Sequence, residues 1–80
     1  MTTTYYVALP FVRNEDGDLV TDEPREAQSE TGAKRIAAAL ATEKAGALAF
    51  SRTGDPEVGE FDDAVILARY GEVAEELLQP

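Results

Sequence analysis

The fold of this chain is decided by residues 5–21, YYVALPFVRNEDGDLVT, in which two apolar runs flank a tight-turn signal. The first run, Tyr5–Val12, is rich in aromatic and branched residues and predicts a β-strand. The Asp-Gly pair ending at Gly17 favours a hairpin, because glycine readily takes the positive φ that a tight turn demands. We expect the second strand to run from Leu19 to about Gln28, with a break or bulge near Pro24, whose nitrogen cannot donate to a ladder.

The next segment predicts one helix. Ser29 is a suitable N-cap, the helix should run from Glu30 to about Ala45, and Gly46 is a natural C-cap. One face carries a stripe of mostly small residues at helical spacing: Ala33, Ile36, Ala37, Leu40 and Lys44. Because its side chains are small, this helix can lie close to a sheet.

The remaining residues predict a second hairpin. Strands are expected at Ala47–Arg52 and Asp63–Tyr70, separated by a glycine- and proline-containing loop at Thr53–Glu60. A short helix at Val73–Leu78 could follow. The expected fold is α+β in the order ββαββ(α): a small four-stranded antiparallel sheet of two hairpins, with one alanine-rich helix across one face, in a single domain covering residues 1–80.

A short pattern occurs twice. Ala8–Arg13 and Ala47–Arg52 share Ala-Leu-x-Phe-x-Arg at an offset of 39 residues, about half the chain. Each copy precedes a turn rich in glycine and acids. The pattern is consistent with a duplicated ββα unit, and also with coincidence among residues that are common in strands.

Composition excludes several function classes. The chain has 80 residues with no His, Cys or Trp, so imidazole and thiol chemistry, disulfides and zinc fingers are impossible. Seven basic residues stand against 16 acidic ones, a net charge of −9, which argues against nucleic-acid binding. We expect no enzyme activity, no cofactor and no metal. A chain this short needs a well-packed core or one shared with a second copy, so a homodimer is expected.

The N-terminal region predicts a cytoplasmic location. No basic residue precedes the first apolar run, and that run is interrupted by Pro10. A signal peptide needs a positively charged start, and a membrane-spanning helix needs about 20 apolar residues. Neither requirement is met.

Two sets of residues are candidates for partner binding. Five acids fall within nine residues, with no base among them, and would attract a basic partner: Asp55, Glu57, Glu60, Asp62 and Asp63. The other reading of this acidic patch is that it serves solubility alone. The six aromatic residues of the chain together exceed what one light helix would cover. Four of them could form a subunit contact: Tyr5, Tyr6, Phe61 and Tyr70.

Other chemical readings of the sequence are weak. Aligning Gly17 with the EF-hand glycine puts Val12 at the first calcium-ligand position, so a solvated turn is the better interpretation. Glu60 and Asp62 could share a face, but nothing indicates that they are buried, as acid–base catalysis would require. Arg13, Arg52 and Arg69 could bind a carboxylate, although such residues more often pair with neighbouring acids.

Two resemblances add expectations. Residues 49–56 (AFSRTGDP) and 59–67 (GEFDDAVIL) resemble short uncharacterised bacterial open reading frames, to which no activity is attached. The hairpin–helix order resembles antitoxins with a partial RNase-H-like fold, which neutralise a small basic ribonuclease. The resemblances imply a bacterial α+β protein and, for the second, a basic protein partner.

Two functions from different classes remain. The first is a non-catalytic, acidic protein-interaction module that associates with itself. The alternative is an inhibitor, antitoxin or nucleic-acid mimic whose acids occupy the groove of a basic protein. Self-association should depend on concentration and little on salt, whereas mimicry should weaken steeply with salt.

Overall fold

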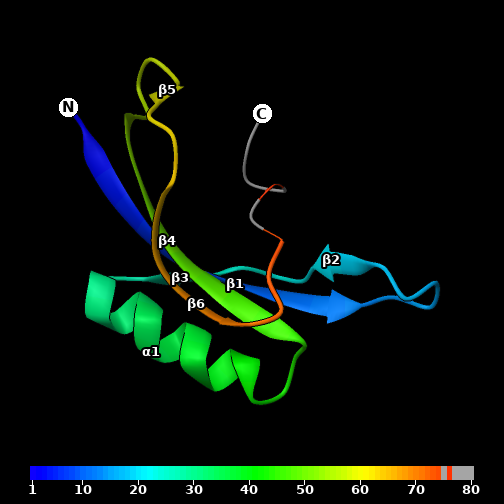
Figure 1. Cartoon of the computed structure of the whole chain (residues 1–80). Coiled ribbons are helices and arrows are strands. Elements are labelled where there is room, and N and C mark those ends of the chain that lie inside the picture. Colours follow the sequence, from blue (N-terminus) through cyan, green and yellow to red (C-terminus); the bar gives the residue numbers. More distant parts are fainter. Residues whose placement is uncertain (75, 77–80) are drawn as a thin grey trace.

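The computed structural model describes residues 1–74 and 76, which form one helix and a curled antiparallel sheet (Figure 1). This confirms the α+β class. In chain order the elements are β1 (Thr3–Arg13), β2 (Leu19–Thr21), β3 (Arg25–Ala27), α1 (Glu30–Ala41), β4 (Gly46–Asp55), β5 (Glu60–Phe61) and β6 (Val65–Gly71). The sheet of the described residues has six strands rather than the four that were expected.

The two additional strands arise where expected segments are divided. The predicted strand Leu19–Gln28 is split into β2 and β3, which lie on either side of Pro24 and both pair with β1. Proline interrupts the ladder because it has no N–H to donate. The expected loop Thr53–Glu60 contains the end of β4 and the start of β5, whose two residues return to pair with β4.

The two long strands form the centre of the sheet. β1 and β4 are antiparallel neighbours through a continuous register from Thr3 opposite Gly54 to Phe11 opposite Gly46. β2 and β3 share the other edge of β1, while β5 and β6 share the other edge of β4. The register with β6 shifts between Ala49 and Phe50, which marks a β-bulge. Because β1 and β4 are the central strands, the two repeated segments lie side by side.

The helix begins where the sequence predicted and ends earlier. The Ser29 hydroxyl accepts a hydrogen bond from the Gly32 backbone N–H at 3.0 Å, as an N-cap should. The helix ends at Ala41 with Thr42 as its C-cap, so the expected extension to Ala45 and the assignment of Gly46 as C-cap were wrong. Gly46 opens β4 instead, where a Cβ would collide with the backbone of Glu72.

The sheet is buried on both faces, by different kinds of side chain. Between the sheet and α1 lies a cluster of mostly small residues. The strands contribute Ala8, Ala47 and Ala49, and α1 contributes Ala33, Ala37 and Leu40. Larger residues face the other way, where Leu9, Phe11 and Leu48 form a second cluster with Ala74. Adjacent residues of a strand point to opposite faces, so the Ala-Leu pairs of β1 and β4 supply both clusters. Alanine lets α1 approach the sheet closely.

Two regions extend beyond the helix-covered part. The β1–β2 hairpin projects from one end, and the β4–β5 turn projects from the other (Figure 1). Glu75, Leu77 and Leu78 of the expected terminal helix Val73–Leu78 lie outside the described residues. Val73 and Ala74 pack against the sheet face opposite α1. No helix of the described residues is long and apolar enough to cross a membrane.

Candidate interaction surfaces

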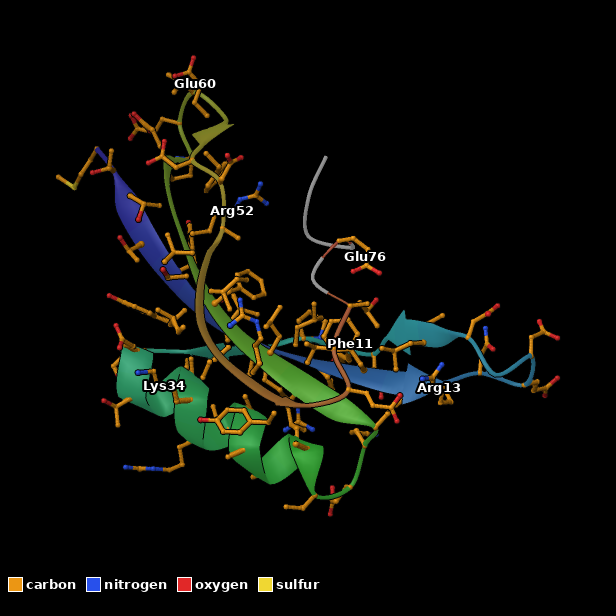
Figure 2. All side chains as sticks on the ribbon, viewed as in Figure 1. Phe11, Arg13, Lys34, Arg52, Glu60 and Glu76 are labelled. Carbon is orange, nitrogen blue, oxygen red and sulfur yellow. The ribbon has the colours of Figure 1, made fainter. Side chains whose placement is uncertain are left out.

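The five candidate acids lie within residues 55–63, which include the β4–β5 turn that projects away from α1 at the top of Figure 1, where Figure 2 labels Glu60. We call Asp55, Glu57, Glu60, Asp62 and Asp63 the acidic tip. Asp55 ends β4 and stands opposite Glu60, the first residue of β5. The sequence had placed Asp55, Glu57 and Glu60 in the loop Thr53–Glu60 and Asp63 at the start of the next strand, whereas Glu60 belongs to β5, which pairs with β4.

The local turn explains why the chain reverses here. The Asp55 carboxylate accepts a hydrogen bond from the Glu57 N–H at 2.9 Å, and Asp55 O accepts one from the Gly59 N–H. Gly59 has φ of 73°, which glycine adopts without the strain that a side chain would cause. The acid at position 55 is therefore part of the turn as well as part of the acidic tip.

The acidic tip is electrostatically unfavourable for the isolated chain. Like charges directly opposite on neighbouring strands destabilise a sheet, and Asp55 faces Glu60 in this way. The amino group of Met1 offsets part of this repulsion, because it lies 3.3 Å from Asp55 Oδ2. The described residues show no other ion pair in the acidic tip. A cationic partner would relieve the remaining repulsion.

Phe61 gives the acidic tip an apolar element. Its ring lies 6.1 Å from the ring of Tyr5, tilted by 43°, and its side chain is still 43% exposed. Gly54 makes this position possible, because a Cβ there would collide with the Phe61 ring. Gly54 was expected in the loop Thr53–Glu60, so its place inside β4, where a strand glycine often allows a close approach, was not predicted.

A shallow open hollow lies beside the acidic tip and is lined largely by its residues: Thr2, Thr53, Gly54, Asp55, Gly59, Glu60, Phe61 and Asp62. It is open to solvent and does not enclose a small molecule as ligand sites usually do. No group of three or more acids in the described residues is arranged to hold a metal ion.

The four candidate interface aromatics lie on two faces of the sheet. Tyr5 contacts Phe61 near the acidic tip, and both occupy the region away from α1. Tyr6 and Tyr70 are half-buried and pack against the alanine cluster beneath α1. One continuous patch therefore cannot contain all four, and each pair serves a different surface.

The three arginines do not converge on one site. Arg13 pairs with Glu72 at the end of β1, and Arg13 also donates a hydrogen bond to Gly17 O at 2.7 Å. Arg52 Nε donates to the Asp62 backbone carbonyl at 3.1 Å and so holds the chain after β5. Arg69 lies on β6, the strand on the other side of the sheet centre from Arg13. A shared carboxylate site is not formed.

Two titratable groups outside the acidic tip have shifted pKa values. The pKa of Asp22 lies below its usual 3.8, because its carboxylate accepts the Glu23 N–H and a hydrogen bond from Lys44. The pKa of Lys34 is raised by Glu30, one helical turn earlier, whose carboxylate lies 2.9 Å away. Both pairs are exposed and secure the two ends of α1, which indicates a structural role.

No protein-family model matches this chain, and no curated protein or solved structure gives a match to it. Its function must therefore be inferred from its own geometry.

Proposed function

We propose that this chain is a non-catalytic protein-interaction module that associates with itself. The observation that carries this proposal is the size of its core. Six of the ten buried hydrophobic residues among the described ones are alanines, and the largest fully buried side chains are Phe11, Leu48 and Pro10. Meanwhile Val58, Phe61 and Val65 are between 43% and 64% exposed. A core this light favours further burial against a second copy.

Sedimentation equilibrium over a concentration range from micromolar to millimolar tests this function. We expect the average mass to rise from one chain to two, and the melting temperature to rise with protein concentration. Raising the salt concentration should change the equilibrium little, because burial of apolar surface is not screened. A chain that stays monomeric at millimolar concentration would overturn the proposal.

The acidic tip supports a second candidate, an inhibitor or antitoxin that binds a basic protein. Asp55, Glu60 and Asp62 line the same hollow as the exposed Phe61, and Asp55 faces Glu60 across the β4–β5 ladder. Interfaces commonly combine an aromatic anchor with complementary charge around it. The resemblance to antitoxins with a partial RNase-H-like fold leads to the same class of partner.

Capture from lysate with two matched variants tests this candidate. One variant neutralises the acidic tip, with Asp55→Asn, Glu57→Gln, Glu60→Gln, Asp62→Asn and Asp63→Asn. The control neutralises five acids elsewhere, with Glu15→Gln, Asp16→Asn, Glu23→Gln, Glu26→Gln and Glu43→Gln. We expect a basic protein that high salt releases, captured by the wild type and the control and lost with the tip variant. Equal capture by both variants would contradict the candidate.

A further inference from the structure

The two edges of the sheet differ in how readily another strand could pair with them. β2 and β3 have three residues each, and between them stand Asp22, Glu23 and Pro24. Short strands, charges and proline are the usual means of blocking an edge. The edge at β6 has seven residues, VILARYG, with no proline and no acid. Among the described residues, β6 pairs with β4 alone.

The charge distribution selects what could pair with this edge. The whole chain carries −9, so two copies repel each other wherever acids would meet. Residues 64–71 contain no acid and one arginine. The acidic tip and the β2–β3 edge both present acids instead. A second copy therefore approaches β6 with less electrostatic cost than it meets at either of these surfaces.

The side of α1 next to β6 is also suited to close approach. α1 packs against β6, and Ala41 of the helix and Tyr70 of β6 both contact the alanine cluster between them. Ala38 precedes Ala41 by about one turn on the same side of the helix, by its 3.6-residue period. Ala38 is exposed, and Ala41 is half-buried against the core. Small side chains let a neighbouring helix come near.

We propose that two copies join through antiparallel pairing of β6 with β6 of the second copy, about a two-fold axis. This gives one continuous sheet with an α1 helix from each copy alongside the junction. The inference rests on the self-association proposed above and names its surface. A strand always forms a self-complementary antiparallel pair about a two-fold axis, so one edge suffices for both copies. Edge strands associate in this way because N–H and C=O groups that point away from a sheet find partners in a second strand.

The size of this surface predicts a weak dimer. Seven strand residues span about 24 Å, and the molecule is 16 Å across in its thinnest direction. Contact along this flank covers on the order of 400 Å² per copy, about half of the usual value for a stable complex. The bulge opposite Ala49 and Phe50 bends β6 and shortens the regular part of the edge. Dimerisation should therefore appear only at high micromolar concentrations.

A pair of lysine variants tests the edge. Val65→Lys puts a charge on β6, and Val58→Lys makes the same change in the β4–β5 turn. Val65 and Val58 are similarly exposed, at 59% and 64%, so neither change opens the core. We expect Val65→Lys to raise the dimer dissociation constant at least tenfold and Val58→Lys to change it less than twofold. Melting curves of dilute protein confirm that both variants fold.

A second pair of variants distinguishes an effect at the β6 edge from an effect of net charge on dimerisation. Arg69→Glu on β6 and Arg25→Glu on β3 each change the net charge from −9 to −11. If total charge alone governed association, both would weaken it equally. We expect Arg69→Glu to weaken the dimer at least fivefold more than Arg25→Glu. Equal effects from the two variants would overturn the placement at β6.

Cysteine scanning locates the junction directly, because the native chain has no cysteine. A disulfide forms only where the two Cα atoms lie within about 7 Å. Single cysteines placed in turn along Val65–Gly71 should give a covalent dimer under mild oxidation only at the position nearest the two-fold axis, because residues farther along the strand move away from their own copy. Cysteines at Thr21 and Val58 should remain monomeric.

The outcomes separate this inference from the function on which it rests. Absence of any dimer at millimolar concentration would overturn both. A concentration-dependent dimer that is insensitive to the β6 variants, with cross-linking at Thr21 or Val58, would overturn the β6 junction and leave self-association standing. A dimer lost with Val65→Lys and trapped by cysteines in β6 would support both.

Discussion

The two copies of Ala-Leu-x-Phe-x-Arg occupy neighbouring strands, yet their phenylalanines have different surroundings. Leu9 stands opposite its counterpart Leu48, whereas Ala8 stands opposite Ala49 rather than opposite its counterpart Ala47. Phe11, however, stands opposite Gly46, while Phe50 stands opposite Val7. Phe11 is fully buried, and Phe50 is half-buried. The two phenylalanines of the repeated pattern should therefore contribute differently to the free energy of unfolding, because they lie at different positions along the β1–β4 ladder.

This comparison also explains the repeat without requiring duplication. Both strands lie at the centre of the sheet, with α1 on one face and larger apolar residues on the other. Each strand needs a small residue toward the helix and a large one away from it. Adjacent Ala and Leu satisfy both needs, because neighbouring side chains point to opposite faces. The duplicated ββα unit remains a hypothesis that comparison with related sequences would test.

The largest effect should come from the two phenylalanines. Removing a buried Phe side chain usually costs about 3–5 kcal/mol, and Phe11→Ala should fall in this range because Phe11 is fully buried. Phe50→Ala should cost less, since part of its ring already contacts solvent. Urea unfolding of both variants at low protein concentration measures the difference. Equal losses would show that the two sites are equivalent after all.

Enlarging an alanine beneath α1 should have the next largest effect. Ala49 is completely buried in the helix-facing cluster, so Ala49→Leu must push α1 away from the sheet. Overpacking of this kind costs about 1–3 kcal/mol. The control Ala39→Leu changes an exposed position of the same helix and should shift the unfolding free energy by less than about 0.5 kcal/mol. If Ala49→Leu is neutral, close packing of α1 is not required.

Arg13 and Arg52 end the two Ala-Leu-x-Phe-x-Arg segments. Replacing either should lower the unfolding free energy by a similar amount, but the two losses should depend differently on salt. Arg13 forms an ion pair with Glu72, and both side chains are about half exposed, so Arg13→Gln should cost less than about 1 kcal/mol. Arg52 donates to a neutral carbonyl of Asp62. In high salt the part of the loss from Arg13→Gln that comes from the ion pair should shrink, because ions screen the pair, while the hydrogen bond to Gly17 O is not screened. The loss from Arg52→Gln should persist, and unfolding curves at two salt concentrations show which occurs.

The smallest effect should come from Asp22, whose contacts lie next to the first Ala-Leu-x-Phe-x-Arg segment. The Asp22 N–H donates to Pro10 O, and its carboxylate lies 3.1 Å from Lys44 Nζ. Because folding lowers the pKa of Asp22 below 3.8, its ionised form stabilises the folded chain above that pH. This contribution is lost as the pH falls through the lowered pKa.

Asp22→Asn should therefore destabilise the chain slightly at pH 7, and its difference from the wild type should shrink as the pH falls from 7 to 3, through the usual pKa of 3.8. Urea midpoints for both proteins at the two pH values test this, with Asp16→Asn as an exposed acidic control. A difference between wild type and Asp22→Asn that persists undiminished at pH 3 would exclude ionisation of Asp22 as its cause.

Short sequence patterns correctly predicted those features that depend only on residues a few positions apart. Ser29 capped α1 as expected, because the cap needs only its own hydroxyl and the next turn. The turn at Gly17 also formed, with φ of 82° and two backbone N–H groups donating to the Asn14 side chain. The end of α1 was not predicted correctly, since Gly46 is required by the distant backbone of Glu72.

The candidate surfaces show the same division. The acidic tip could be recognised from the sequence because its five acids are close along the chain. The opposition of Asp55 and Glu60 could not, because it depends on β5 pairing with β4. Tyr6 and Tyr70 likewise looked equivalent to Tyr5 and Phe61 until the register assigned them to the helix-covered side.

The sequence by itself determined the α+β class, the hairpin turn, the start of the helix and the acidic character of residues 55–63. These depend on short-range effects: periodicity, capping, glycine conformation and covalent proximity. Only the tertiary structure decided that β1 and β4 lie side by side, that Phe11 is more buried than Phe50, and that β6 forms an edge. Each of these follows from pairing between residues far apart in the chain, which a local pattern cannot specify.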